Sequence, residues 1–389
     1  MIRKIFYRFS WLVFIYHWLW SFFAALFCDF PSRNIFVLGV TGTKGKSTVL
    51  ELTAFILEKA GKKVAVSSSL RNGESSMTMP GRFFLQRFLK KAVVGKCDYA
   101  LIEVTSQGVS QSRHRFIKWD AVIFTNLSPE HIEAHGSFDN YKKAKLDFFR
   151  YAGSGFSKLF IINKDDASSK DFIDAVGGGK IILYEKSDLF SNLIGDFNKY
   201  NIGAAVAFAE SRGIARDIIK EAVGEFSGIS GRMEFLKKEP FAVVLDYAHT
   251  PDSLRKVYEA LREKNPNSHP PVGGPISKLI CVLGAAGGGR DKWKRPEMGK
   301  IAGQYCDEII LTDEDSYNEE LEDIINEIAA GCPRAQKILD RKEAIKKAVS
   351  LAGPGDVVAI TGKGSERWIH KKNNQKIPWS DKQVVLSVI

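Results

Sequence analysis

The chain has 389 residues, of which 44% are hydrophobic and 26% are charged. This composition is typical of a folded globular protein and excludes a disordered chain, a collagen-like chain and a polytopic membrane protein. The 56 Lys and Arg against 45 Asp and Glu leave a net charge of +11, spread without a long basic run. The charge suits an anionic ligand or surface, and its even spread argues against a nucleic-acid-binding arm.

The five cysteines are scattered along the chain, and none forms a C-x-x-C pair. This spacing predicts neither a disulfide framework nor a zinc site. It indicates a reducing compartment, so we expect a cytoplasmic protein.

Residues 9–27 carry no charge apart from His17, and Arg3, Lys4 and Arg8 precede them. A bilayer-spanning helix needs ~20 apolar residues, which this segment nearly provides. Three interpretations are open. The segment is a helix lying at a membrane surface, a helix docked on the protein's own body or on a partner subunit, or a membrane span. The dense aromatic residues favour the membrane surface. By the positive-inside rule, a span would place the rest of the chain outside the cytoplasm, away from nucleotides.

From Asn34 onward, apolar runs with the composition of strands alternate with helical stretches. Such alternation predicts an α/β fold with a mostly parallel sheet covered by helices on both faces. A second series of the same kind begins near Phe241, and the glycines within 228–231 look like the connector. Residues 264–278 are rich in Pro, Gly and Ser and predict an exposed loop. The expected strands are 35–40, 64–68, 99–104, 121–126 and 159–163, then 242–247, 279–283, 308–312 and 357–361.

The first expected strand leads into the run Thr41-Gly-Thr-Lys-Gly-Lys-Ser-Thr, which precedes a helical stretch. A strand, a glycine-rich loop, a Lys-Ser pair and a helix together form a cradle for a triphosphate. Lys46 would reach the terminal phosphates and the Ser47 hydroxyl would bind Mg²⁺. The strict pattern needs Gly where Val40 stands, so an ordinary glycine-rich turn is the alternative. The residues expected to contact ATP here are Gly42, Thr43, Lys44, Gly45, Lys46, Ser47 and Thr48.

This loop resembles that of the Mur ligase superfamily, ATP-dependent ligases that join an amino acid or peptide to a carboxylate. Further motifs follow in the family's order, and the three that begin at Ser230, Asp246 and Gly287 are most similar to the UDP-N-acetylmuramyl-tripeptide synthetase branch. The motifs are Glu103-Val-Thr-Ser-Gln-Gly-Val, Phe124-Thr-Asn-Leu-Ser-Pro-Glu-His, Tyr141-Lys-Lys-Ala-Lys, Gly195-Asp-Phe-Asn-Lys-Tyr-Asn, Ser230-Gly-Arg-Met-Glu, Asp246-Tyr-Ala-His-Thr-Pro-Asp and Gly287-Gly-Gly-Arg-Asp.

The resemblance spans about residues 34–370 and implies a domain layout. We expect a hydrophobic N-terminal segment (1–33), a central phosphate-loop ATPase domain (34–231) and a C-terminal Rossmann-like α/β domain that binds the amino acid (232–389). The family's N-terminal UDP-binding domain has no room before the phosphate loop, and the layout that remains is similar to folylpolyglutamate synthase.

The resemblance also implies a reaction in which a carboxylate attacks the γ-phosphate of ATP and an amine then displaces phosphate from the acyl phosphate. We expect a monomeric, Mg²⁺-dependent ligase that adds a free amino acid to a muramoyl-peptide-type carboxylate in cell-wall precursor synthesis. The alternatives are a folylpolyglutamate-synthase-like ligase and a non-catalytic ATP-binding subunit that docks through residues 1–30.

By the same resemblance, two Mg²⁺ ions are bound by Ser47, Glu103, His131 and Lys145, the last as a carbamate formed with CO₂. Burial makes such a modification reasonable, because a buried lysine loses its proton more easily. The alternative roles are structural: a helix-capping carboxylate, a packed histidine and a lysine on a solvated helix face. The expected catalytic residues are therefore Lys46, Glu103, His131 and Lys145.

The remaining expected contacts follow the family's motifs. Tyr317 stands where the diaminopimelate-adding members have an Arg that pairs with a distal carboxylate, so a basic amino acid such as lysine or ornithine is one option. Further expected ATP contacts are Asn126, Asn198, Asn201, Arg232, Asp246 and His249. Expected acceptor contacts are Thr78, Ser106, Gln111 and Arg113, and expected amino-acid contacts are Arg290, Asp315, Tyr317, Gly362 and Glu366.

Overall fold

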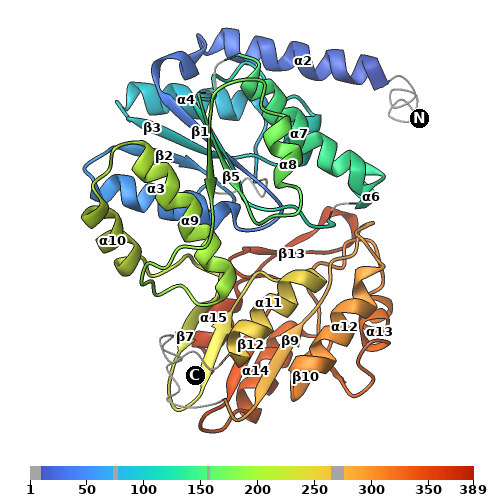
Figure 1. The fold of residues 1–389 in the computed structure, drawn as a ribbon. Helices are drawn as coiled ribbons and strands as arrows, with labels where there is room; N and C mark the ends of the chain where they lie inside the picture. Colours follow the sequence, from blue (N-terminus) through green and yellow to red (C-terminus); the bar gives the residue numbers. More distant parts are fainter. Residues whose placement is uncertain (1–9, 73–77, 131, 156–157, 264–275) are drawn as a thin grey trace. The chain divides into compact units, whose positions relative to one another are not determined.

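The computed structural model describes residues 10–72, 78–130, 132–155, 158–263 and 276–389. His131 and most of the loop expected over 264–278 therefore lie outside the described residues. The chain forms two compact units (Figure 1). Unit 1 comprises Met1–Ser191 with Asn198–Phe226, and unit 2 comprises Asn192–Phe197 with Ser227–Ile389.

Unit 1 is built on a six-stranded sheet in which every paired strand is parallel. Its order is β2-β3-β1-β4-β5-β6, so β1 is central and Val40 near its end lies opposite Glu103 at the end of β3. The carboxyl ends of neighbouring parallel strands meet at one sheet edge, where ligands bind in such folds. The strands are β1 (Phe36–Thr41), β2 (Val64–Ser67), β3 (Tyr99–Glu103), β4 (Ala121–Phe124), β5 (Leu159–Asn163) and β6 (Lys180–Tyr184).

Helices cover both faces of this sheet, because its strands are apolar on both sides (Figure 1). Phe124, Phe149 and Phe172 belong to the core on one face, and Leu38, Val49 and Phe208 belong to the core on the other. The main helices of the unit are α3 (Lys46–Lys59), α4 (Arg82–Val94), α5 (Ser106–Ser110), α6 (Ile132–His135), α7 (Phe138–Gly153), α8 (Ser169–Asp174), α9 (Asp196–Ser211) and α10 (Arg216–Glu225).

Unit 2 contains a second six-stranded sheet of order β11-β10-β9-β12-β8-β7, parallel except for β7 at its edge, and a β13–β14 hairpin. The expected α/β class with a mostly parallel sheet is confirmed. Its strands are β7 (Glu234–Lys237), β8 (Ala242–Leu245), β9 (Leu279–Leu283), β10 (Glu308–Leu311), β11 (Gln336–Lys337), β12 (Val357–Ile360), β13 (Trp368–His370) and β14 (Lys376–Pro378). Its helices include α11 (Pro251–Arg262), α12 (Lys294–Tyr305), α13 (Leu321–Ala329), α14 (Arg341–Leu351) and α15 (Asp381–Leu386).

The expectation that the cysteines form no disulfide is wrong at one pair. Cys281 in β9 and Cys306 after α12 are bonded, with their Cα atoms 6.0 Å apart. The 25 residues between them conceal this proximity in the sequence. Because β9 pairs with β10 and α12 leads directly into β10, the sheet register brings the two sulfur atoms together.

The N-terminal helix α2 (Ser10–Phe27) packs one face against unit 1, beside α4. Ser21, Ala24 and Ala25 are buried on this face, and the Trp18 ring meets the Phe116 ring edge-on at 5.1 Å. Within the described part of the chain, no helix is long and apolar enough to cross a membrane.

Candidate ATP and amino-acid sites

The loop between β1 and α3 is too tight for side chains at two of its glycines. Gly42 and Gly45 have positive φ angles of 148° and 83°. A Cβ atom on Gly42 would overlap the Thr125 hydroxyl, and one on Gly45 would overlap the Asn201 amide oxygen. The loop leads directly into the N-terminus of α3, whose free N–H groups favour an anion.

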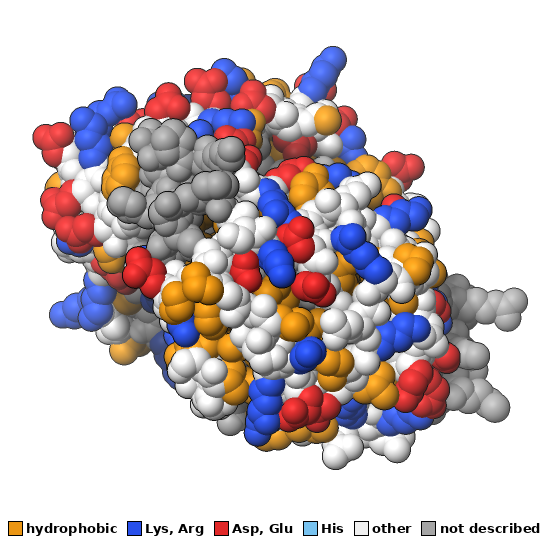
Figure 2. All heavy atoms as spheres, turned by 90° about the horizontal axis from the view of Figure 1, so that it is seen from below, with side chains coloured by type: hydrophobic (Ala, Val, Ile, Leu, Met, Phe, Trp, Pro, Cys, Tyr) orange, Lys and Arg blue, Asp and Glu red, His pale blue; other side chains and the backbone are white. Residues whose placement is uncertain are grey.

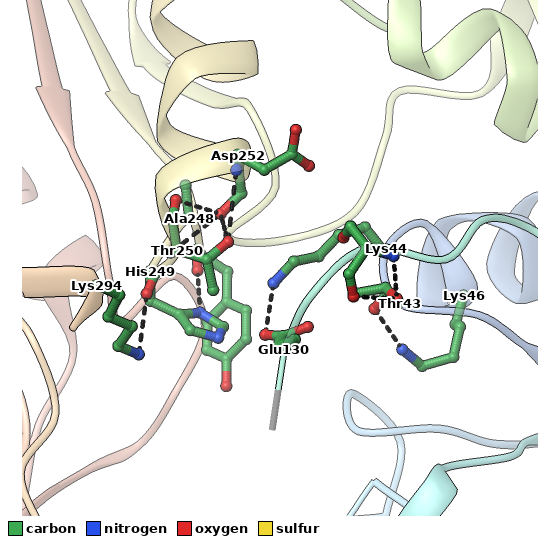
Figure 3. A network of polar contacts seen from close by, with 12 residues as sticks. Thr43, Lys44, Lys46, Glu130, Ala248, His249, Thr250, Asp252 and Lys294 are labelled. Atoms are coloured by element: carbon green, nitrogen blue, oxygen red, sulfur yellow. Dashed lines mark hydrogen bonds and ion pairs between the residues drawn. The ribbon is translucent and has the colours of Figure 1, made fainter. Parts of the chain in front are cut away.

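Lys46, the first residue of α3, points back into this loop (Figure 3). Its Nζ donates to the carbonyl oxygens of Gly42 at 3.1 Å and Thr43 at 2.8 Å. The same Nζ lies 4.0 Å from Glu103 Oε1. The loop therefore holds the ammonium group at its centre.

Ser47 and Glu103 bring two oxygen ligands together at the end of β3. Ser47 Oγ donates to Glu103 Oε2 at 3.0 Å, and the N–H of Ser69 donates to the same oxygen at 3.3 Å. Hydroxyl and carboxylate oxygens are the ligands that Mg²⁺ prefers, so this pair fits the ion. Among the described residues, no group of three or more His, Cys, Asp and Glu could hold a metal.

Lys145 of α7 is buried against the phosphate loop and is only 1% exposed. Its Nζ donates to the Gly42 carbonyl at 2.7 Å and lies 4.8 Å from the centre of the Tyr141 ring. Burial, and secondly the charge of Lys46, lower the pKa of Lys145 well below its usual value. A neutral amine at this position is the chemical form that reacts with CO₂.

Sequence reasoning did not single out the polar cluster beside this lysine. The Tyr141 hydroxyl lies 3.0 Å from Thr43 Oγ1. Lys44 Nζ donates to Glu130 at 2.8 Å (Figure 3). Tyr141 and Glu130 stand within quoted motifs, so the motifs contained this signal. The cluster ties α7 and the segment after β4 to the phosphate loop.

The expected asparagines also lie at this edge of unit 1. Asn126 Oδ1 accepts from the Lys44 N–H at 2.9 Å, and Asn126 Nδ2 donates to the Lys44 carbonyl at 3.1 Å. Asn198 and Asn201 share one face of α9, where Asn201 Nδ2 donates to Asn198 Oδ1 at 2.8 Å.

Two of the expected acceptor residues belong to a turn after α5 that carries positive charge. Arg113 donates to the Gln111 side chain at 2.6 Å and to the carbonyl of Met79. Burial, and then the neighbouring charge of Arg82, lower the pKa of Arg113.

The other two expected acceptor residues have separate partners. Ser106 Oγ lies 3.0 Å from His135 Nε2 at the end of α6. The carbonyl oxygen of Thr78 accepts from Asn72 at 3.2 Å.

The nucleotide contacts expected from unit 2 lie around the end of β8. The Arg232 guanidinium stacks 4.0 Å from the centre of the Tyr247 ring. Asp246 accepts from the N–H groups of Met233 and Ala248 at 2.8 and 2.7 Å, and His249 Nδ1 meets the Tyr247 carbonyl at 2.7 Å. Both Asp246 oxygens thus order the backbone of this loop.

The expected amino-acid site in unit 2 contains a lysine that sequence reasoning overlooked. Lys363 is fully buried and donates to Asp315 Oδ1 at 2.9 Å and to Glu366 Oε2 at 2.6 Å. The Tyr247 hydroxyl donates to the other Glu366 oxygen at 2.8 Å. Lys363 lies inside the Gly362-Lys-Gly-Ser-Glu366 run, so it too had a sequence signal.

Tyr317 occupies a strained position beside this group. Its φ is +49°, its ring stacks on His370 at 5.1 Å, and the Arg290 guanidinium lies 5.8 Å from its ring centre. Glu314 is buried, and a Cβ on Gly362 would approach its Oε2 to 2.6 Å. Burial raises the pKa of Glu314 to about 7.

Comparison with known proteins agrees with this geometry. Residues 40–188 match the model of the Mur ligase middle domain, and residues 231–364 match that of the Mur ligase, glutamate ligase domain. The UDP-N-acetylmuramoyl-L-alanyl-D-glutamate–2,6-diaminopimelate ligase of Aquifex aeolicus is 37% identical, over 92% of this chain and 78% of its own. The ligase of the same name from Syntrophomonas wolfei is 34% identical, over 94% of this chain and 80% of its own.

Solved structures show the same architecture. A ligase of the diaminopimelate type aligns with a TM-score of 0.60 at 28% identity, covering 91% of this chain and 78% of that one. The folylpolyglutamate synthase of Mycobacterium tuberculosis, complexed with ADP and AMPPCP, aligns with a TM-score of 0.70 over 87% and 91%. At 15% identity, that second likeness shows the fold alone.

These matches define an ATP-dependent ligase that forms carbon–nitrogen bonds. The chain belongs to the Mur ligase family, as its motifs predicted.

Proposed function

We propose that this enzyme adds a free amino acid to the carboxylate of a muramoyl peptide in the synthesis of peptidoglycan or a related cell-wall precursor. The observation that carries the proposal is the buried Lys145, held against the same phosphate loop as Lys46. The relatives named as muramoyl-peptide ligases support the choice of acceptor. A subunit without catalysis would have no need to keep this amine buried at the loop.

In the proposed reaction, an acceptor carboxylate oxygen bonds to the γ-phosphorus of ATP and ADP leaves. The amine nitrogen then bonds to the acyl carbon, phosphate leaves and the nitrogen loses a proton. The first step joins two anions, so it needs concentrated positive charge. Lys46 supplies that charge at the terminal phosphates. Contacts with ATP are also proposed for Asn126, Asn198, Asn201, Arg232, Asp246 and His249.

Mg²⁺ ions, two by family resemblance, would neutralise the phosphate charge when bound. Ser47 and Glu103 would hold one of them, and His131 and Lys145 would hold the other. We propose that the neutral Lys145 amine first bonds to CO₂ and releases a proton. The lysine carbamate that results supplies oxygen ligands in place of an ammonium group. A folylpolyglutamate synthase from Yersinia pestis with a similar fold was solved with AMPPNP and a Mn ion.

For the incoming amino acid, we propose that Arg290 binds the α-carboxylate. Asp315 and Glu366 would face the rest of the molecule. Lys363 lies between them and compensates one of their two negative charges, so the group keeps a net negative charge that suits a side chain ending in an ammonium group. Tyr317 cannot form the bidentate ion pair that an Arg gives a distal carboxylate. Lysine or ornithine therefore fits this site better than diaminopimelate.

For the acceptor, Ser106, Thr78, Gln111 and Arg113 are the proposed contacts, with Arg113 pairing with an anionic group. We propose that the protein acts as a monomer in the cytoplasm, where ATP is available. The Cys281–Cys306 bond removes the cysteine argument for a reducing compartment, so the proposed location rests on the need for ATP. We further propose that residues 9–27 contact a membrane surface there, because the described part of this segment exposes many large apolar side chains.

The test is phosphate release from ATP by the purified protein with Mg²⁺ and bicarbonate. The acceptors are UDP-N-acetylmuramoyl-dipeptide, a UDP-free muramoyl-dipeptide and a folate monoglutamate, each offered with a panel of amino acids. We expect release only with a muramoyl acceptor plus one basic amino acid. Release with folate and glutamate, or no release with any pair, would contradict the proposal.

A further inference from the structure

The outer face of α2 gathers most of the large apolar side chains that are exposed among the described residues of unit 1. Between Trp11 and Phe27, nine large apolar side chains are 40–72% exposed. Monomeric proteins rarely expose a continuous apolar stripe of this length without a binding partner. The residue types on this face indicate a bilayer surface, because Trp and Tyr, here Trp11, Tyr16 and Trp20, favour the headgroup region.

Polar contacts fix α2 so that this face points away from unit 1. Ser21 Oγ donates to the Ser112 carbonyl at 2.8 Å and accepts from Arg82 Nε at 3.1 Å. Arg82 Nη2 donates to the Gln111 carbonyl at 2.7 Å and also contacts His17. These contacts secure the buried face of α2 to α4 and to the turn that carries Gln111.

The helix beside α2 carries charge of one sign. Its neighbour α4 has the sequence RFFLQRFLKKAVV, with four basic residues and no acidic one. Arg87, Lys90 and Lys91 are exposed, and none forms an ion pair with another described residue. Figure 1 shows α2 and α4 lying together at the edge of unit 1. By contrast, the face in Figure 2 mixes basic and acidic side chains among apolar ones.

We propose that α2 and α4 together form a docking surface for an anionic bilayer, in which α2 inserts its aromatic face and α4 binds lipid phosphates. The inference rests on the membrane contact proposed for residues 9–27 and adds the second helix and the lipid charge. A second copy of this chain fits less well, because pairing two such surfaces would bring their like charges together. The contacts of Ser21 and Arg82 imply that docking holds the Gln111 turn, and with it the acceptor, near the membrane.

The experiment is flotation of the full chain with phosphatidylcholine vesicles, with and without phosphatidylglycerol. We expect co-flotation with the anionic vesicles, a blue shift of tryptophan fluorescence and weaker binding at high salt. The triple variant Arg87→Gln/Lys90→Gln/Lys91→Gln should lower the partition coefficient on the order of 100-fold. The matched triple Lys238→Gln/Lys342→Gln/Lys347→Gln, exposed lysines of unit 2, should leave it unchanged.

A second variant, Trp11→Ser/Trp20→Ser, should abolish the blue shift, and ATP binding by each variant verifies that it is folded. Failure to float, equal binding to both vesicle types, or dimers by light scattering that exclude vesicles would overturn the proposal. Flotation needs no substrate or turnover, so its failure is distinguishable from failure of the proposed ligase reaction.

Discussion

Lys145 Nζ donates to the carbonyl oxygen of Gly42 at 2.7 Å, across 103 positions of the chain. This hydrogen bond joins α7 to the loop that cradles phosphate. It places an amine whose pKa is lowered by burial beside the charge of Lys46.

Replacing Lys145 with Ala should lower turnover by at least about 1,000-fold, because an oxygen ligand to the metal and much of the local charge stabilisation would be lost. The measurement is phosphate release at saturating ATP. Protein equilibrated with ¹³C-bicarbonate should show a carbamate carbon signal by NMR. Lys145→Arg, which keeps a cation but cannot form the carbamate, should lack that signal, and near-normal activity of either variant would refute the role.

Glu103→Gln should raise the Mg²⁺ concentration needed for half-maximal activity by about tenfold or more. The variant keeps the shape of the side chain but removes the negative charge that Mg²⁺ favours. Removing the metal with EDTA should abolish phosphate release by the unmodified protein, and added Mg²⁺ should restore it. An unchanged Mg²⁺ titration for Glu103→Gln would show that the ion is held elsewhere.

Tyr317→Arg should raise kcat/KM for diaminopimelate by about 10- to 100-fold relative to lysine. The physical reason is a new charge-assisted pair with the distal carboxylate, which contributes about 1.5–3 kcal/mol. The measurement is competition between the two amino acids at limiting concentration. Tyr317→Phe is the control and should keep the original preference, since it adds no cation.

Glu314 should make unit 2 less stable as pH rises. Burial raises the pKa of Glu314 from 4.5 to about 7, so the folded state favours the protonated form. Its stabilising contribution is complete below pH 4.5 and is lost as pH rises through 7. Between mildly acidic and mildly alkaline pH, the free energy of unfolding should fall by about 2 kcal/mol from this group. Urea denaturation should show this slope, and Glu314→Gln should flatten it.

Arg341 and Asp381 form a fully buried bidentate ion pair in unit 2, with contacts of 2.8 and 2.7 Å. Asp381→Ala should lower the free energy of unfolding by about 3–5 kcal/mol, because it leaves the guanidinium buried without its carboxylate. The double variant Arg341→Met/Asp381→Leu should recover most of that loss. Equal instability of the single and double variants would mean that the uncompensated charge is not the cause.

The strand positions and the chemistry of the phosphate loop were determined by the sequence itself. Apolar runs such as 159–163 became strands because their backbone groups must pair once the side chains are buried. Gly42 and Gly45 could be assigned to a tight loop because, with the neighbouring Lys46 and Ser47, they form the local pattern of a phosphate-binding loop. Such local structure depends on residues that are adjacent in the sequence, so it can be predicted without knowing any distant contact.

The tertiary structure alone decided which distant groups meet. Nothing in the spacing of Cys281 and Cys306 predicts their bond, and nothing in the charge of Lys363 predicts that it is buried between Asp315 and Glu366. The burial of a side chain and its pairing with distant groups depend on the order of the strands in the sheet and on which helices cover the sheet. The same packing selected Lys145, out of a run of three lysines, as the one whose amine is removed from water.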